Sequence, residues 1–309
     1  MADSSRHNLS YVQESTYGVT PTSNPTFTDL RHTSVTLGLT KGAKTSDELN
    51  PDRQIRDHRH GIRSVSGDIG FELSYESFDD MLEAMAQGTW TTDVLKAGTT
   101  RRSFSVLRHF SDIADGAAKP YQLFTGCEVN SFNLTVNAED PVTGTFSLLG
   151  KDLSPLQNLT AFGTPTFSSP TTTEMFDGFT GFVKENGVTI ATVTEITLSW
   201  DNGLEPRYSV FSDSTSQHGN GRSNLTGSIG AYFDDSSLIE KFLDETVSSL
   251  EFELEDPAGN KYTFLIPKIK YTGGQADATG QSNIQTNLPF QAIFDSTEAT
   301  NIKITRTDA

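Results

Sequence analysis

The chain has 309 residues, with 40 Asp and Glu against 23 Lys and Arg, and so carries a net charge of −17 at pH 7. This balance argues against a protein that grips nucleic acid by its phosphates or adheres to anionic lipid, because both need clustered cations. The single cysteine excludes a disulfide framework and multi-cysteine zinc sites. No apolar run approaches the roughly 20 residues of a membrane-spanning helix, and residues 1–10 lack the apolar stretch of a signal peptide. We therefore expect synthesis in a cytoplasm and no membrane insertion.

Along the chain, alternation of apolar and polar residues predicts β-strands almost throughout. The first thirty residues are rich in Ser, Thr and Pro and are expected to form an extended arm. Two short amphipathic segments, Ser77–Ala86 and Ser236–Leu243, predict α-helices, each with Ser or Asp available as the N-cap. The expected fold class is all-β with short helices. The predicted strands are 35–39, 66–70, 103–110, 121–124, 144–149, 196–200, 226–230, 249–254, 262–265 and 287–293.

The order of these elements occurs twice. The apolar alternation at 35–39 matches that at 196–200, and the pattern Gly-x-Ile-Gly at 67–70 matches the one at 227–230. A short helix, a hairpin and a final strand follow in both halves. This order indicates a tandem duplication of one module with a flanking short helix. The expected boundaries are a first module at 1–153 with the N-terminal arm, a linker rich in Ser, Thr and Pro at 154–173, and a second module at 174–309.

Candidate catalytic and metal-binding residues are weak. His58 and His60 lie in a long polar loop without a third ligand nearby, and this pattern is more typical of a solvated or interface loop. Cys127 and His109 lack any surrounding catalytic signature, so a buried structural cysteine is the better interpretation. We therefore predict no catalytic, cofactor-binding or metal-binding residues, and no enzyme.

One strand carries an unusual charge pattern. Glu251, Glu253 and Glu255 alternate with apolar residues and so point to one side, about 6.8 Å apart. Like charges on one strand face repel each other and add nothing to packing. Two interpretations remain open: a solvated outer face, or a negative surface that faces a polyanion.

Several segments resemble one family, the major tail tube proteins of long-tailed phages. The resemblance is strongest over residues 11–90 and extends over most of the chain. The segments that carry it are Tyr-Val-Gln-Glu-Ser-Thr-Tyr-Gly-Val-Thr-Pro at 11–21, Ser-Asp-Glu-Leu-Asn-Pro-Asp-Arg-Gln at 46–54, Arg-Ser-Val-Ser-Gly-Asp-Ile at 63–69, the run 71–90, Thr-Gly-Ser-Ile at 226–229 and Asp-Pro-Ala-Gly-Asn at 256–260.

This resemblance implies a structural virion protein, made in the host bacterial cytoplasm, whose rings stack into a hollow tail tube. It implies a β-barrel or sandwich module, a lumen through which DNA passes only as cargo, and as partners the tape-measure protein, the tail terminator and the tail-tip or baseplate proteins. Family rings present six modules, so a duplicated chain predicts a homotrimer with pseudo-sixfold symmetry. Candidate lumen-facing acidic residues are Glu251, Glu253 and Glu255, or equally Asp68 and Glu72; the candidate inter-ring loop contains Asp52, Arg53, Arg56, Arg59 and Arg63.

Three alternatives remain. In the first, six chains form the ring and the second module decorates the outside. In the second, the chain is a tail-tip or carbohydrate-binding β-sandwich, although Trp90 and Trp200 are its only tryptophans. In the third, a hydrolase is built on a β scaffold, but no constellation of residues favours it.

Overall fold

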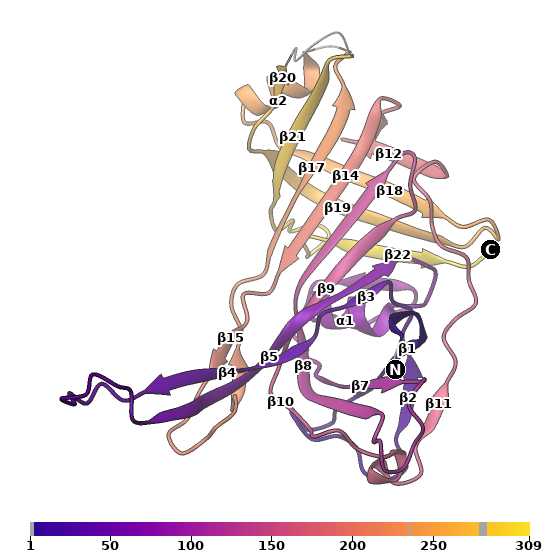
Figure 1. Cartoon of the computed structure of the whole chain (residues 1–309). Helices are drawn as coiled ribbons and strands as arrows, with labels where there is room; N and C mark the ends of the chain where they lie inside the picture. The colour runs from indigo at the N-terminus through magenta and orange to yellow at the C-terminus, as the bar shows by residue number, and fades with distance from the viewer. Residues whose placement is uncertain (1–2, 235, 278–282) are drawn as a thin grey trace.

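The computed structural model describes residues 3–234, 236–277 and 283–309, and in these the chain is mostly β-strand with two short α-helices (Figure 1). This confirms the expected fold class. The helices are α1 (Asp79–Ala86) and α2 (Ser237–Leu243). No helix in this part of the chain is long and apolar enough to cross a membrane. The strands are β1 (His7–Gln13), β2 (Thr26–Asp29), β3 (Ser34–Val35), β4 (Gly38–Thr45), β5 (His58–Glu72), β6 (Val94–Lys96), β7 (Phe104–Phe110), β8 (Tyr121–Asn137), β9 (Thr143–Gly150), β10 (Asp152–Leu153), β11 (Thr166–Ser168), β12 (Gly181–Glu185), β13 (Val188–Thr189), β14 (Val193–Asp201), β15 (Glu205–Arg207), β16 (Gln217–Gly219), β17 (Asn224–Tyr232), β18 (Ser248–Glu255), β19 (Lys261–Tyr271), β20 (Gln275–Asp277), β21 (Gln285–Ala292) and β22 (Lys303–Thr307).

Six strands from both halves form one continuous antiparallel sheet in the spatial order β5, β9, β8, β14, β17, β21. The two halves meet where β8 pairs with β14, from Asn137 opposite Glu195 to Ser131 opposite Asp201. At one margin β3 and β4 pair with β5, and at the other β20 and the end of β19 pair with β21. We refer to this assembly as the inner sheet.

Most of the remaining strands form a second layer over the inner sheet, whereas β15 and β16 pair only with each other. In the first half, the beginning of β8 pairs with β7, β7 with β1, and β1 with β2. In the second half, β19 pairs with β18 and β18 with β12. The strand β22 lies between β19 and β6 and so ties the second half to the first. Because β8 and β19 continue from one layer into the other, the two layers share strands.

The apolar sides of both layers face one core that extends through the two halves. Phe71 and Phe146 stack with ring centroids 4.6 Å apart, and Phe252 stacks on Phe264 at 4.9 Å. Burial of each such ring stabilises the fold by about 2–3 kcal/mol relative to leaving it exposed. Trp200, on the predicted strand at 196–200, is 1% exposed, and Cys127 is buried as the sequence predicts.

The helices lie where the sequence predicts them, but neither has a capping hydrogen bond from the side chain of its N-cap residue. α1 begins after Phe78, which offers no capping oxygen, while the hydroxyl of Ser77 bonds that of Ser74 at 2.6 Å. At α2, Ser236 makes no capping bond to the backbone and donates instead to Glu240 at 2.7 Å. The prediction of a Ser or Asp cap is therefore wrong for α1. At α2 the predicted serine is the N-cap residue, but its hydroxyl bonds a side chain instead of the backbone.

Two hairpins leave the same end of the inner sheet (Figure 1). The first, which we call arm 1, consists of β4 and the beginning of β5 with the turn between them; the second, arm 2, consists of β15 and β16 with the turn between them. The polar loop expected between Lys41 and Ile62 is thus partly strand, because cross-strand pairs such as Thr45 with His58 satisfy its backbone.

Candidate functional site

The side of the inner sheet that faces away from the core is mostly polar, with Leu149, Tyr232 and Pro289 as its apolar members. Its side chains alternate with the buried apolar residues along each strand, and strand pairing aligns them in rows. Some pair with each other, as Thr197 does with Ser228 at 2.7 Å and Ser147 with Asp68 at 2.5 Å. The members that carry hydroxyl or amide groups are Ser66, Thr143, Thr145, Ser147, Ser131, Asn133, Thr135, Asn137, Thr197, Ser199, Asn224, Thr226, Ser228, Gln285, Asn287 and Gln291. We call this surface the polar face.

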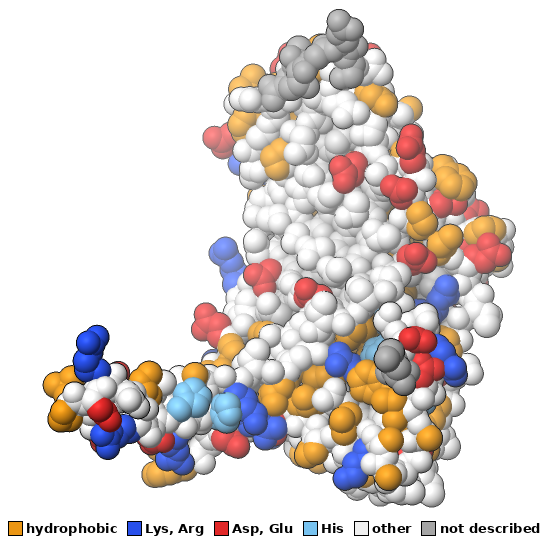
Figure 2. All heavy atoms as spheres, viewed as in Figure 1, with side chains coloured by type: hydrophobic (Ala, Val, Ile, Leu, Met, Phe, Trp, Pro, Cys, Tyr) orange, Lys and Arg blue, Asp and Glu red, His pale blue; other side chains and the backbone are white. Residues whose placement is uncertain are grey.

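The formal charges on the six central strand segments of the polar face are all negative, whereas Lys270 at the end of β19 lies on the same side at the margin, opposite Gln291. Asp68 and Glu72 lie on it, as do Glu195 and Asp201. The six strand segments that build it, 64–72, 131–137, 143–150, 193–201, 224–232 and 285–292, contain no Lys or Arg. In Figure 2 this part of the molecule is a broad, largely white surface with scattered acidic side chains. The sequence reasoning named Asp68 and Glu72 but missed Glu195 and Asp201.

The acidic residues of β18 lie elsewhere. Leu250, Phe252 and Leu254 point into the core, so Glu251, Glu253 and Glu255 point outward from the second layer. They have cationic partners there: Lys184 lies 3.4 Å from Glu251, and Lys261 lies 3.2 Å from both Glu253 and Glu255. The hydrogen bonds that Lys261 donates to Glu255 and Glu253 raise the pKa of Lys261. The structure thus separates the two sets of candidate acidic residues onto different surfaces.

The candidate inter-ring residues occupy arm 1, except for one at its base. Asp52, Arg53, Arg56 and Arg59 are exposed, and Arg56 pairs with Asp52 at 2.7 Å. Arg63 instead contacts Asp152 at 2.7 Å and donates to the carbonyl of Leu153 at 2.9 Å. Arg63 therefore anchors the arm, whereas the other three arginines are presented to solvent.

The ends of both arms expose large apolar side chains. Leu49 and Ile55 on arm 1 are 99% and 71% exposed, and Val210 and Phe211 on arm 2 are essentially uncovered. Figure 2 shows the tip of arm 1 as a mixture of apolar and charged side chains. Exposed apolar groups on a projecting hairpin are typical of a contact with another macromolecule.

Arm 2 is fixed at its base by a buried polar cluster. His218 is 1% exposed and lies 2.8 Å from the carboxylate of Glu128, which also receives two short hydrogen bonds from Arg101. Gln87 and Asn220 exchange amide hydrogen bonds of 2.8 and 2.9 Å. Since Glu128, Arg101 and Gln87 belong to the first half, these contacts hold an arm of the second half against the first.

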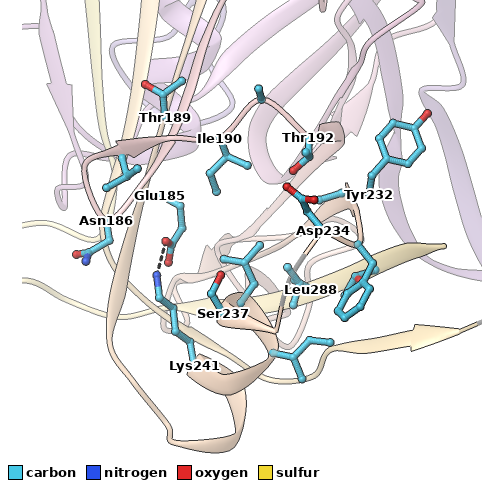
Figure 3. Close-up of a pocket in the computed structure, with 17 residues that line it drawn as sticks. Glu185, Asn186, Thr189, Ile190, Thr192, Tyr232, Asp234, Ser237, Lys241 and Leu288 are labelled. Atoms are coloured by element: carbon cyan, nitrogen blue, oxygen red, sulfur yellow. Dashed lines mark hydrogen bonds and ion pairs between the residues drawn. The ribbon is translucent and has the colours of Figure 1, made fainter. Parts of the chain in front are cut away.

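A pocket of about 430 Å³ lies beside α2, at the end of the inner sheet opposite the arms (Figure 3). Its charged residues that the structure describes are Glu185, Lys241 and Asp234. Glu185 is 4% exposed and pairs with Lys241 and with the hydroxyl of Ser248. The carboxylate of Glu185 is therefore engaged within the fold. Within the described residues, no group of three or more His, Cys, Asp or Glu side chains is arranged to hold a metal.

Two comparisons with known proteins bear on these features. No curated protein sequence matches the chain. The family model for the phage tail tube protein matches residues 4–292, a range that includes the inner sheet and both arms. This family consists of structural components of the virion that assemble with themselves and with other tail proteins. The chain therefore belongs to the phage tail tube protein family.

Proposed function

We propose that three copies of this chain form one ring of the tail tube, with pseudo-sixfold symmetry and with the polar face lining the bore. The observation that carries the proposal is the junction of β8 with β14, which joins both halves of the chain into one sheet with one polar face. An arrangement of six chains with the second half outside the ring would require only one half of that sheet to face the bore.

The tandem duplication is proposed on the same grounds. The register of β3 with β5 places Val35 opposite Ile69, and the register of β14 with β17 places Ile196 opposite Ile229. Each half thus contributes four strand positions to the inner sheet. In the first half, β3 and β4 together occupy one position, and β5, β9 and β8 occupy the other three. In the second half the four positions are β14, β17, β21 and β20. The proposed modules keep the boundaries 1–153 and 174–309.

The dimensions of such a ring suit a passing DNA duplex. Eight strand positions in each of three chains give 24 strands, and at a spacing of about 4.8 Å and a tilt of about 40° these close at a diameter of roughly 48 Å. Side chains narrow the lumen to about 35–40 Å, while a duplex is about 20 Å across. The ring therefore leaves room for a layer of water around the DNA.

The composition of the polar face suits passage rather than binding. Lys and Arg bind DNA by displacing condensed counterions, and the six strand segments that build the centre of this face contain neither. Lys270, at the margin of the face, lies 3.5 Å from Glu245. The carboxylates of Asp68, Glu72, Glu195 and Asp201 repel phosphates, and the hydroxyl and amide groups between them hold water. On this proposal Glu251, Glu253 and Glu255 belong to the outside of the tube.

Arms 1 and 2 are proposed to reach the next ring of the stack. Both leave one end of the inner sheet, and the other end carries exposed acidic groups, including Glu139 and Asp140 between β8 and β9 and Asp234 after β17. The arginines of arm 1 are complementary to that end. Tape-measure, terminator and tail-tip proteins are proposed as the further partners of the tube.

Electron microscopy of the purified protein, with averaged end views of rings or tubes, tests the ring. We expect three chains and six lobes around a bore of about 35–40 Å. Six chains in each ring would refute the trimer. A chain that stays monomeric even with a tail-tip nucleus would refute assembly through these surfaces.

A triple variant tests the role of arm 1. Arg53, Arg56 and Arg59 changed to Glu should leave the fold intact but stop rings from stacking, because like charges would then meet. Arg63 is retained because it anchors the arm to Asp152. As a control for the chemical change at a single site, the exposed Arg6, which pairs with Asp112 outside the arm, is changed to Glu. Tubes of normal length from the triple variant would overturn this role.

A further inference from the structure

Both margins of the inner sheet have an unpaired edge. Among the described residues, β3 and β4 pair with β5 alone, and β20 pairs with β21 alone. The exposed N–H and C=O groups of such edges are templates for pairing with another strand. One margin lies in the first half of the chain and the other in the second half.

The first margin corresponds to β14, which is paired. The strands β3 and β4 have the same register against β5 as β14 has against β17. Val35, Leu37 and Leu39 are therefore the counterparts of Ile196, Leu198 and Trp200. Ile196 and Trp200, which lie beside β8, are 2% and 1% exposed, whereas Val35 and Leu39 are only partly buried. The first margin therefore lacks the neighbour that β14 has.

The second margin corresponds to the end of β8. Between Val129 and Ser131, the register of β8 with β9 shifts by one residue. The same shift of one residue separates the pair Tyr271–Phe290 from the pair Gln275–Asn287 along β21. When the register shift of β8 is superimposed on the register shift between β19 and β20, residues 273–277 become the counterparts of residues 131–135. The second margin is thus a copy of the strand that covers β14 within the chain.

We propose that the margin of one chain at β20 pairs with the margin of the next chain at β3 and β4, in the register of the internal β8–β14 junction. Within the chain, Asn133 lies opposite Ser199 and Leu134 opposite Leu198. The counterparts between chains are Gln275 opposite Gly38, Ala276 opposite Leu37, and Asp277 opposite Thr36. This inference rests on the proposed ring and specifies the contact that closes it.

The two helices support the same repetition. α1 buries five residues, and second-half residues cover its first turn, since Tyr262 and Arg306 both bond to Asp79. α2 buries none of its residues, and Leu243 is 69% exposed. In the proposed contact, the first half of the next chain covers α2 as the second half of the same chain covers α1. One mode of packing then serves all six junctions of the ring.

Paired cysteines test the register. In Gly38→Cys/Gln275→Cys the two thiols lie on the polar face of adjacent chains, directly opposite one another, where Cβ atoms are about 4.5–5.5 Å apart. A Cβ at Gly38 meets nothing nearer than a backbone oxygen at 3.7 Å, so the substitution fits. Mild oxidation of assembled rings should link most chains into covalent species that end at the trimer on a denaturing gel.

Three controls make the outcome specific. Asn133→Cys/Ser199→Cys places the same pair at the internal junction and should form a disulfide within one chain, visible as a change in mobility without higher species. Thr40→Cys/Gln275→Cys is displaced by two residues and should link poorly. The native chain, whose Cys127 is buried, should not link.

The possible failures can be told apart. Rings seen by electron microscopy in which the displaced pair links best, or in which neither pair links, would overturn the register while leaving the ring intact. A covalent ladder that ends at six chains would preserve the register and refute the trimer. If no rings form and only the internal control forms its disulfide, both the ring and this contact are overturned.

Discussion

Asn202 makes a sharp test of the junction between the two halves. It follows β14, is 2% exposed, and uses its whole amide group. Its Nδ2 donates to the carbonyls of Met85 and Val129, both at 3.0 Å, and its Oδ1 accepts from the indole of Trp200 at 2.9 Å. The donors and acceptors around it fix the orientation of the amide. One side chain thus connects α1, β8 and β14.

Asn202→Asp keeps the shape of the side chain and replaces the amino group with a second acceptor. Two hydrogen bonds are lost, each contributing about 0.5–1.5 kcal/mol, and two carbonyls then face an oxygen. An unpaired buried charge costs about 3–5 kcal/mol, so we expect the free energy of unfolding at pH 7 to fall by about 3–5 kcal/mol. The loss should be smaller near pH 5, because a protonated carboxyl can donate to one carbonyl.

Urea unfolding followed by tryptophan fluorescence measures this effect. With a slope of about 3 kcal/mol/M, the midpoint should fall by about 1–1.7 M. The control is Asn186→Asp in the exposed turn after β12, where the same change in charge should alter stability by less than about 0.5 kcal/mol. A loss below about 1 kcal/mol in Asn202→Asp would refute the view that this amide holds the halves together.

Three further predictions follow from the buried and charged groups. Glu14 is 6% exposed and accepts two backbone N–H groups and two serine hydroxyls, so Glu14→Ala should lower the urea midpoint to a similar extent. Burial is the main cause that lowers the pKa of His7 to about 4, and the charges of His32, Arg108 and His109 act in the same direction. Since the unfolded chain binds this proton near pH 6.5, the free energy of unfolding should fall as the pH drops from about 6.5 to about 4. A free energy of unfolding that stays constant over this pH range in wild type, but not in His7→Gln, would contradict this. Tubes of Glu195→Lys should retain duplex DNA that a nuclease cannot reach at about 50 mM salt, and should release it near 200 mM. Tubes of Glu251→Lys, with the same change in charge, should bind only DNA that the nuclease can digest. The reverse result would place β18 in the bore.

Much of the fold could be predicted from local pattern. The strand at 196–200 and both helices lie where alternation and helical spacing predict them, because each pattern matches a half-buried element. The strand character of arm 1 was missed, since its residues are polar on both sides and its pairing satisfies the backbone rather than building a core. The expected capping bonds are absent because Ser77 and Ser236 bond other side chains, although Ser236 is the N-cap residue of α2.

Only some of the acidic residues of the polar face could be predicted from the sequence. The alternation of Glu251 with Phe252 predicts one exposed face, but so does that of Thr197 with Leu198, and a strand does not reveal which layer it joins. Glu195 and Asp201 became candidates only when pairing aligned them with Asn137 and Ser131. One signal was available earlier: the absence of Lys and Arg from six strand segments in a chain with 23 of them.

The β8–β14 junction has a kinetic consequence. In the proposed ring of three chains, which six equivalent contacts would close, three of the contacts are made within a chain and form when that chain folds, whatever its concentration. Each association between separate bodies costs several kcal/mol of translational and rotational freedom, and a trimer incurs that cost twice rather than five times. The rate of ring formation should therefore rise with about the third power of protein concentration or less, instead of the sixth. A phage that links two modules in one chain can begin its tail at a lower concentration of subunits.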